Sequence, residues 1–491
     1  MPDLAKNAQQ YANRSLVPPT SNDLFYRVWA HKAELAVGVL AAGVATLFVT
    51  APWAIAVLGG AAVLTLSIVE SEAVLLLAIF LMPLGWTLQW NVPVRDVCVA
   101  FRSLVIIGFF LGRLLRGQLG VRVLLRPALT QASLLFLCVA IAPALLGTGD
   151  LTLESARSLW ALFTSLGFYF VILSWVDSPQ RIRRILQVLL FSTIVTAAFA
   201  ILQEIIGDYT SFWFFLHPQD WLAPMEHRAP SFFANCNFLA SYLNLIVPFS
   251  LAFWILGEGR WKRLGVWTTG LGAVALLCTQ SLGGLVSFGG IVLLAILCFS
   301  GNWKKKLALF GAVCALAIGF FFAMQTLNPA HVGAVFAYDE AIRLVLWGIA
   351  WDFFRHSPVL GVGWGNFVVL YGSYVGDISW IPAGQFQVHS IYLQLLAETG
   401  LVGFAAFFLL IFRAIQQALR QLRCSVYTLQ KALAFGVLGA ILSVLLHGSV
   451  DFFFQVSPQF STLFWVLLAL LVVGGNTISK RKDGELEMQT G

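Results

Sequence analysis

Long apolar stretches, separated by short polar ones, run through most of the chain. A membrane-crossing helix needs about 20 mostly apolar residues, and continuous runs of that length are not the alternating pattern of a membrane barrel. The pattern predicts an all-α fold, a polytopic transmembrane helical bundle of about 12–14 spans. Fourteen spans are expected near residues 33–49, 52–69, 72–89, 97–115, 128–147, 157–175, 185–206, 236–256, 264–280, 282–299, 305–325, 390–412, 431–449 and 460–476.

Two pairs of these spans are nearly continuous. Residues 33–69 divide only at TAPW, and residues 265–300 divide only at TQSLGG. Each stretch is long enough to cross the bilayer twice with a tight turn between the crossings. If either stretch formed one long or re-entrant element, the count would fall to thirteen or twelve.

Two long polar gaps interrupt the apolar pattern, at residues 207–235 and 326–388. The second gap contains DEAIRLVLWGIAWDFF, in which apolar residues recur at helical spacing. We expect an amphipathic helix there, lying on the outer surface of the membrane. Its apolar face would comprise Ile342, Val345, Leu346, Ile349 and Phe353.

The positions of the basic residues predict an orientation. With the N-terminus placed in the cytoplasm, 24 of the 30 lysines and arginines fall in cytoplasmic segments and five outside, with Arg102 inside a span. Such an imbalance is typical of positive-inside topology, and it places both termini in the cytoplasm and both polar gaps outside. The first thirty residues lack an early apolar stretch, so we expect no cleaved signal peptide.

These features divide the chain into four predicted regions. Two are cytoplasmic tails and two are membrane regions, the second of which includes the outer, periplasmic loop 326–388. The regions are the N-terminal tail 1–32, the N-terminal transmembrane helices 33–206, the second transmembrane region 207–476 and the C-terminal tail 477–491.

Composition excludes several classes of protein. Only 11% of the 491 residues are charged and 59% are hydrophobic, whereas a soluble domain carries about 25% charged residues. The net charge of +7 comes from short loops, so we expect membrane lipids and no nucleic acid as partners. Seven cysteines occur without CxxC spacing, which predicts neither a disulfide framework nor a zinc site. We expect no metal and no cofactor.

Three residues are the main candidates for chemistry. His389 begins the span after the longest outer gap, where a neutral imidazole could accept a proton; a structural histidine is the simpler alternative. Arg228 and Arg343 lie in the two outer gaps, where guanidinium groups could bind phosphate. The alternatives are snorkelling towards lipid headgroups for Arg228 and an ion pair with Glu340 for Arg343.

Other polar residues near the same face are candidates for a supporting role. Gly361 and Gly363 could form a loop whose N–H groups cradle phosphate, although a plain tight turn after Pro358 is the more common explanation. Glu398 lies about half a helical turn out of phase with His389, so we expect no direct contact, and Arg102 is its candidate partner. His447 and Asp451 are four residues apart and could form a hydrogen-bonded pair that stiffens the site, although structural bridging within the bundle is the more common explanation.

Four segments together resemble the O-antigen ligase/polymerase superfamily of bacterial membrane glycosyltransferases. They are RAPSFFANCNFLASYL, RLVLWGIAWDFFRHSPVLGVGWGNF, HSIYLQLLAETGLVG and the weaker HGSVDFFF, covering roughly residues 228–455. Two features depart from the family pattern. Ligases usually have about twelve helices, whereas fourteen spans are expected here. The family's asparagine–proline–asparagine-like stretch reads NCN at Asn235–Asn237. These departures leave the subfamily open.

The resemblance implies a metal-independent transfer at the periplasmic face of the plasma membrane. The donor would be a glycan on undecaprenyl pyrophosphate and the acceptor a lipid A–core hydroxyl. Arg228 and Arg343 would hold the pyrophosphate, and His389 would be the general base. O-antigen or exopolysaccharide polymerase and protein O-oligosaccharyltransferase remain as alternatives with other glycan or protein acceptors.

A bicarbonate-transporter-like protein is the alternative from a different class. Transport predicts ionisable residues near the middle of the membrane and internal pseudo-symmetry. The chain has few intramembrane charges and no clear repeat, and its polar candidates gather at one face. The sequence therefore favours the enzyme.

Overall fold

The computed structural model describes residues 52–84, 94–118, 120, 124–146, 149–210, 227–233, 235–327, 340–375, 387–455 and 457–490. Within these ranges all regular elements are helices and none is a strand. They are α4 (Pro52–Val69), α5 (Ser71–Phe80), the 3₁₀ turn η1 (Met82–Leu84), α6 (Val94–Leu115), α8 (Ala128–Leu146), α9 (Leu153–Trp175), α10 (Pro179–Ile206), α11 (Cys236–Leu256), α12 (Gly259–Thr279), α13 (Leu282–Phe299), α14 (Trp303–Leu327), α16 (Glu340–His356), α17 (Phe367–Leu370), α18 (Gly372–Val375), α19 (Ile391–Cys424), α20 (Thr428–His447) and α21 (Pro458–Thr490).

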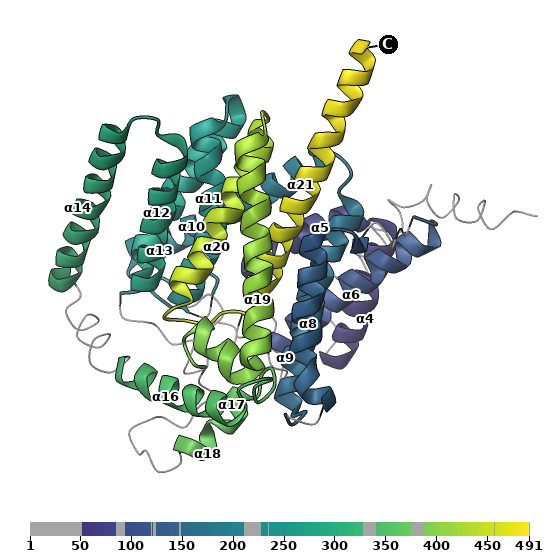
Figure 1. Cartoon of the computed structure of the whole chain (residues 1–491), viewed down its shortest axis with the longest axis vertical. Coiled ribbons are helices and arrows are strands. Elements are labelled where there is room, and N and C mark those ends of the chain that lie inside the picture. Colours follow the sequence, from purple (N-terminus) through teal and green to yellow (C-terminus); the bar gives the residue numbers. More distant parts are fainter. Residues whose placement is uncertain are drawn as a thin grey trace, which may run out of the picture.

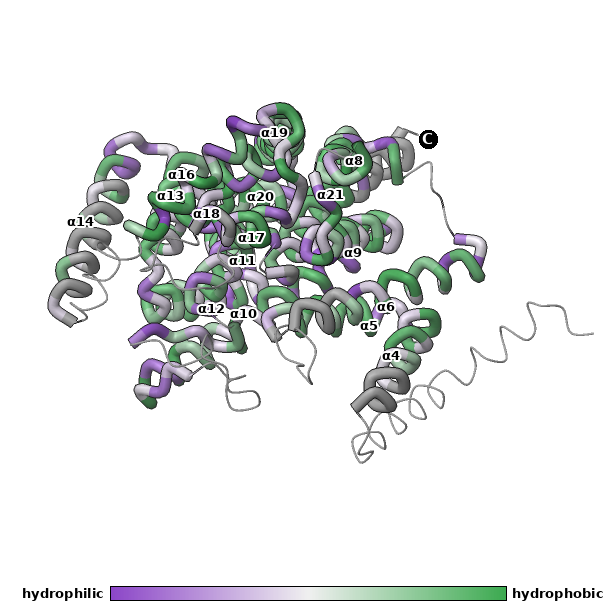
Figure 2. The backbone as a smooth tube through the Cα atoms, turned by 90° about the horizontal axis from the view of Figure 1, so that it is seen from below, coloured by the Kyte–Doolittle hydropathy of each residue, from purple (hydrophilic) through white to green (hydrophobic). Residues whose placement is uncertain are grey.

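The long helices stand side by side as a bundle (Figure 1). Among the described helices, eight are long and apolar enough to cross a membrane: α8, α9, α10, α11, α13, α19, α20 and residues 459–476 of α21. Their tubes are largely green, that is hydrophobic, in Figure 2. Large apolar side chains also cover the outside, with Leu145 78% exposed, which suits contact with lipid. The predicted all-α polytopic membrane fold is confirmed.

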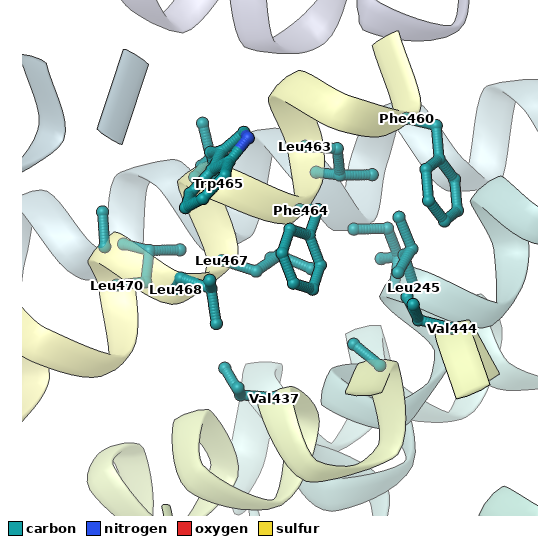
Figure 3. Close-up of a cluster of buried hydrophobic side chains, with 14 of the residues drawn as sticks. Leu245, Val437, Val444, Phe460, Leu463, Phe464, Trp465, Leu467, Leu468 and Leu470 are labelled. Carbon is teal, nitrogen blue, oxygen red and sulfur yellow. The ribbon is translucent and has the colours of Figure 1, made fainter. Parts of the chain in front are cut away.

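Helix α21 lies at the centre of the bundle. The apolar window 459–476 is 89% buried, the largest buried share among the candidate spans in the described part of the chain. Phe464, Trp465 and Leu467 of α21 pack with Leu245 of α11 and Val444 of α20 (Figure 3). Since lipid tails are as apolar as leucine, close packing rather than the hydrophobic effect must hold these helices together.

Most predicted spans correspond to helices, with differences at particular points. The TQSLGG division is confirmed, because α12 ends at Thr279 and α13 begins at Leu282, with the Ser281 hydroxyl accepting a hydrogen bond from the Gly284 N–H. The predicted span 72–89 is too long, since α5 ends at Phe80. The predicted span 33–49 lies outside the described residues.

The amphipathic helix exists as α16, with α17 and α18 close by at one end of the bundle (Figure 1). Ile342, Leu346, Ile349 and Phe353 are buried as predicted, and Val345 is partly buried. The apolar face packs on other protein residues, and the position of the helix at the outer membrane surface stays a prediction. The residues that this face contacts are Phe367 and Tyr371, at α17 and just after it, Val388 before α19, and Ala397 within α19.

Helix α19 is broken at Gly400, whose φ of 61° and ψ of −165° are not helical. The loop after α16 fills the break. The N–H groups of Val362 and Gly363 donate to the carbonyls of Ala397 and Glu398, each at 2.9 Å. The N–H groups of Leu401 and Val402 donate in turn to carbonyls of that loop. Backbone groups that the break would leave unpaired are thus satisfied, as a membrane requires.

Replacing Gly400 by alanine should destabilise the protein. A Cβ there would lie 2.3 Å from the Val359 carbonyl oxygen, and the backbone conformation is strained for any other residue. We expect Gly400→Ala to lower the free energy of unfolding by at least about 1–3 kcal/mol. Gly348→Ala in α16, where a Cβ meets nothing within 4 Å, is the control and should be neutral or stabilising. Thermal unfolding of both variants in detergent measures the difference, and equal stability would contradict the role of the break.

Candidate functional site

The turn that carries His389 is held against the end of α20. The Ile391 N–H donates to the Gly448 carbonyl at 2.7 Å, and the Tyr392 hydroxyl donates to the Leu445 carbonyl at 2.9 Å. His389 itself has a φ of 53°, a left-handed conformation that is uncommon outside glycine. Such strain persists only where surrounding contacts fix it, and it is frequent at functional sites.

His389 pairs with Asp451, which lies between α20 and α21. The Nδ1–Oδ1 distance is 3.1 Å. Burial alone would raise the pKa of Asp451, but the hydrogen bond and charge of His389, together with the charge of His447 and the Phe452 N–H, hold that pKa below its ordinary value. An ionised carboxylate can only accept, so His389 Nδ1 carries the hydrogen and Nε2 keeps its lone pair. The imidazole is 32% exposed and can meet a substrate.

The expected pairing of His447 with Asp451 is wrong. His447 is buried, and its Nδ1 lies 3.1 Å from the Ser241 hydroxyl of α11. Asp451 takes His389 as its hydrogen-bond partner instead. A spacing of four residues brings two side chains together only within a helix. Here α20 ends at His447, and Asp451 lies beyond the helix. The two side chains remain close enough for their charges to interact.

Arg228 is fixed by two hydrogen bonds at the start of α11. Its Nε donates to the Thr279 carbonyl at 3.1 Å, and one terminal nitrogen donates to the Asn237 Oδ1 at 3.0 Å. The NCN stretch explains this placement. Asn235 caps α11 by accepting from the Asn237 N–H at 2.7 Å, and Asn237 then faces the guanidinium. These contacts orient Arg228 through protein groups rather than through lipid headgroups alone.

Arg343 lies on α16, half-buried, and neither a hydrogen bond nor an ion pair joins it to a side chain that the structure describes. The Glu340 side chain, its alternative partner, lies outside the described part. One helical turn further on, the buried indole N–H of Trp347 likewise finds no acceptor among described residues. Residues four apart share a helix face, so two donors are available on one side of α16.

Charge interactions link the candidate site residues to one another. The Arg343 charge acts on His447, and His447 in turn interacts with Asp451. The charges of Arg228 and Asp451 both act on the thiol of Cys236 at the start of α11. Two guanidinium groups and the His389–Asp451 pair therefore gather at the end of the bundle that α16 covers.

The buried Glu398 side chain organises the loop and the His389 turn. Its carboxylate accepts from the N–H groups of Gly365 and Phe367 and from Gln455 Nε2. Arg102, its predicted partner, donates instead to the hydroxyls of Ser165 and Thr462. The expected lack of contact between Glu398 and His389 agrees with the hydrogen bonds of the described residues.

The glycine-rich loop binds this carboxylate. Gly361 and Gly363 have φ of 71° and 99°, and a Cβ on Gly361 would lie 2.3 Å from the Glu398 carbonyl carbon. The N–H groups of Gly361 and Gly363 donate to carbonyls of the chain itself. The tight-turn interpretation therefore fits the contacts, and the phosphate-cradle hypothesis has no support from these donors.

Sequence reasoning missed the polar residues that connect these parts. Gln455 bridges Glu398 to Gln394, which accepts from the Val388 N–H at 3.0 Å, immediately before His389. Asn237 and Ser241 orient Arg228 and His447. The available signal was chemical, since polar side chains inside apolar spans are costly without partners. In the described residues, no three His, Cys, Asp or Glu side chains cluster to hold a metal.

A known protein family matches part of the chain. Residues 267–408, which include α16, the glycine-rich loop and His389, match the family described as O-Antigen ligase. No curated protein sequence matches the chain. The matched segment agrees with the resemblance carried by the motifs around Arg343 and His389. Through this segment the chain is similar to the O-antigen ligase superfamily, which supports, at a coarse level, a membrane glycosyltransferase of the ligase or polymerase type.

Proposed function

We propose that the protein transfers a glycan from an undecaprenyl-pyrophosphate carrier to a hydroxyl of lipid A–core, as a ligase. The reaction takes place at the periplasmic face of the plasma membrane, with both termini in the cytoplasm. The observation that carries this proposal is the hydrogen bond from His389 to Asp451, which occupies Nδ1 and leaves Nε2 of the partly exposed imidazole to accept a proton.

The proposed step balances with the residues at the site. The acceptor hydroxyl loses its proton to His389 Nε2 as its oxygen bonds to the anomeric carbon of the donor glycan. The bond from that carbon to the phosphate oxygen breaks, and undecaprenyl pyrophosphate leaves with the electron pair. Asp451 stabilises the imidazolium that forms. Arg228 and Arg343 stabilise the negative charge that grows on the leaving pyrophosphate.

The arrangement of the arginines supports their different roles. Arg228 is fixed by Thr279 and Asn237 and can act as a preorganised contact. Arg343 has no hydrogen bond or ion pair with a side chain that the structure describes, and its charge acts on His447. The surrounding bundle exposes apolar side chains along which a prenyl chain can lie.

Reconstitution tests the function. The full chain, in liposomes with undecaprenyl-pyrophosphate-linked oligosaccharide and lipid A–core, should form a glycosylated lipid A–core product detectable by gel shift and mass spectrometry. Parallel reactions with free polysaccharide repeat units or an acceptor peptide separate the polymerase and protein-transfer alternatives. EDTA should leave the rate unchanged. Product with none of the three acceptors, together with bicarbonate uptake by the liposomes, would contradict the proposal.

Replacing His389 tests the general base. We expect His389→Ala to lower the turnover number by at least about 100-fold, because general base catalysis contributes that much or more. Asp451→Asn should lower turnover as well while leaving donor KM nearly unchanged, since it disturbs the tautomer of His389 and not donor binding. The control is His356→Ala in α16, an exposed histidine that bonds to the Asp352 carbonyl. Near-normal turnover of the His389 variant would refute the assignment.

Replacing the arginines tests donor binding. Each loss of a guanidinium–phosphate contact removes about 1.5–3 kcal/mol, so Arg343→Ala should weaken kcat/KM for the donor by about 10- to 100-fold. Arg228→Ala should do the same. Arg355→Ala, at the other end of α16 beside Asp352, is the matched control and should leave kcat/KM for the donor unchanged. If the Arg343→Ala variant had the kcat/KM of the wild type for the donor, Arg343 would have no role in donor binding.

A further inference from the structure

A polar cavity lies at the opposite end of the bundle from His389. Its volume is about 750 Å³, and it opens between the start of α8, the end of α19, the start of α20 and the middle of α21. The last three turns of α19 form one wall, and residues around the start of α20 and at Gly475–Asn476 of α21 form the others. It contains none of the residues of the proposed active site, so it needs a separate explanation.

The charge of this cavity is one-sided. Arg126, Arg413 and Arg420 line it, and among the described residues its lining contains no aspartate or glutamate. Arg413 and Arg420 are seven residues apart on α19, which places them on one face of the helix. All three arginines are exposed. Three guanidinium groups without a carboxylate among their lining neighbours favour an anion, and phosphate is the anion whose geometry matches a guanidinium fork.

A buried amide adds a second, independent observation. Gln421 is only 8% exposed and lines the cavity. Its Nε2 donates to the Leu471 carbonyl at 2.9 Å, which fixes the orientation of the amide. Its Oε1 is buried and has no partner among the described residues. A buried acceptor without a partner costs about 1–3 kcal/mol, so the site favours a ligand that also carries a donor.

We propose that this cavity binds the headgroup of an anionic phospholipid that carries a hydroxyl, such as phosphatidylglycerol. The phosphodiester lies among the three arginines, and a glycerol hydroxyl donates to Gln421 Oε1. A lipid, rather than a soluble phosphate, is the source because the wall continues into apolar surface. Val426 in the lining is 75% exposed, and Phe412, next to Arg413, is 54% exposed. Basic pockets between transmembrane helices are sites of this kind.

Binding to the full chain tests this proposal and does not depend on the glycosyltransferase activity. Native mass spectrometry in detergent compares phosphatidylglycerol, phosphatidylcholine and phosphatidylmethanol, the last being a phosphodiester of equal charge without a headgroup hydroxyl. We expect phosphatidylglycerol to bind most tightly and phosphatidylcholine least. Equal binding of phosphatidylglycerol and phosphatidylcholine would overturn the anionic site. Equal binding of phosphatidylglycerol and phosphatidylmethanol would overturn the role of Gln421.

Variants locate the site. Since each basic residue at a membrane surface contributes about 1 kcal/mol, Arg413→Ala/Arg420→Ala should weaken phosphatidylglycerol binding about 30-fold. Lys262→Ala/Arg263→Ala removes two exposed positive charges from the same end of the bundle, on α12, and should change binding less than about 2-fold. Equal effects of the two double variants would show a general surface charge effect and overturn the site.

Two further experiments test the hydrogen bond to Gln421 and the source of the phosphate. Gln421→Met keeps the volume and removes the acceptor, so it should abolish the preference for phosphatidylglycerol over phosphatidylmethanol. A retained preference would contradict the contact with Oε1. Glycerol 1-phosphate, added in water at millimolar concentration, should not displace the lipid. Full displacement would identify a soluble phosphate as the ligand and overturn the lipid assignment.

Discussion

The buried carboxylate of Glu398 is the group on which the His389 end of the bundle depends. A carboxylate in an apolar bundle is stabilised only when donors surround it, and removing one partner of such a group costs several kcal/mol. Here the donors come from three places in the sequence: the loop after α16, Gln455 before α21, and α19 itself. One side chain therefore joins α16, the broken helix α19 and the connection between α20 and α21. The turn of His389 and the loop of Asp451 are both attached to this network, through Gln394 and Gln455.

Much of the fold could be predicted from apolar run lengths, because a span must hide its backbone from lipid and only a helix does so alone. The division at TQSLGG and the apolar face of α16 followed from local signals, glycine and helical spacing. The short α5 did not, because the residues after Phe80 remain apolar and composition does not show where a helix ends inside a bundle. The packing of α16 on protein could not be predicted either, since an apolar face does not show whether it contacts lipid or other residues.

For the candidate site, the position of the main residues could be predicted from the sequence, but their hydrogen-bond partners could not. The order of segments and the topology placed Arg228, Arg343 and His389 at one end, which required only the sidedness of loops. The pairings were different. Asp451 bonds to His389, 62 residues away, and not to its near neighbour His447. Such partners are chosen by packing between α11, α19 and α20, which a single sequence does not specify. The glycine-rich loop is the clearest example. Its sequence suggested N–H donors for phosphate, but these donors bond to the chain's own carbonyl and carboxylate groups.

The break at Gly400 constrains how the protein is assembled in the membrane. The carbonyls of Ala397 and Glu398 at the end of the first part of α19 find their donors in a segment about thirty-five residues upstream. Until that segment is in place, the entering helix would present open backbone to hydrocarbon, which lipid does not tolerate. Biogenesis therefore has a preferred order, in which the extramembrane segment condenses on the incoming helix as it inserts. A chaperone or insertase acting on this chain would have to shelter that half-helix during the interval.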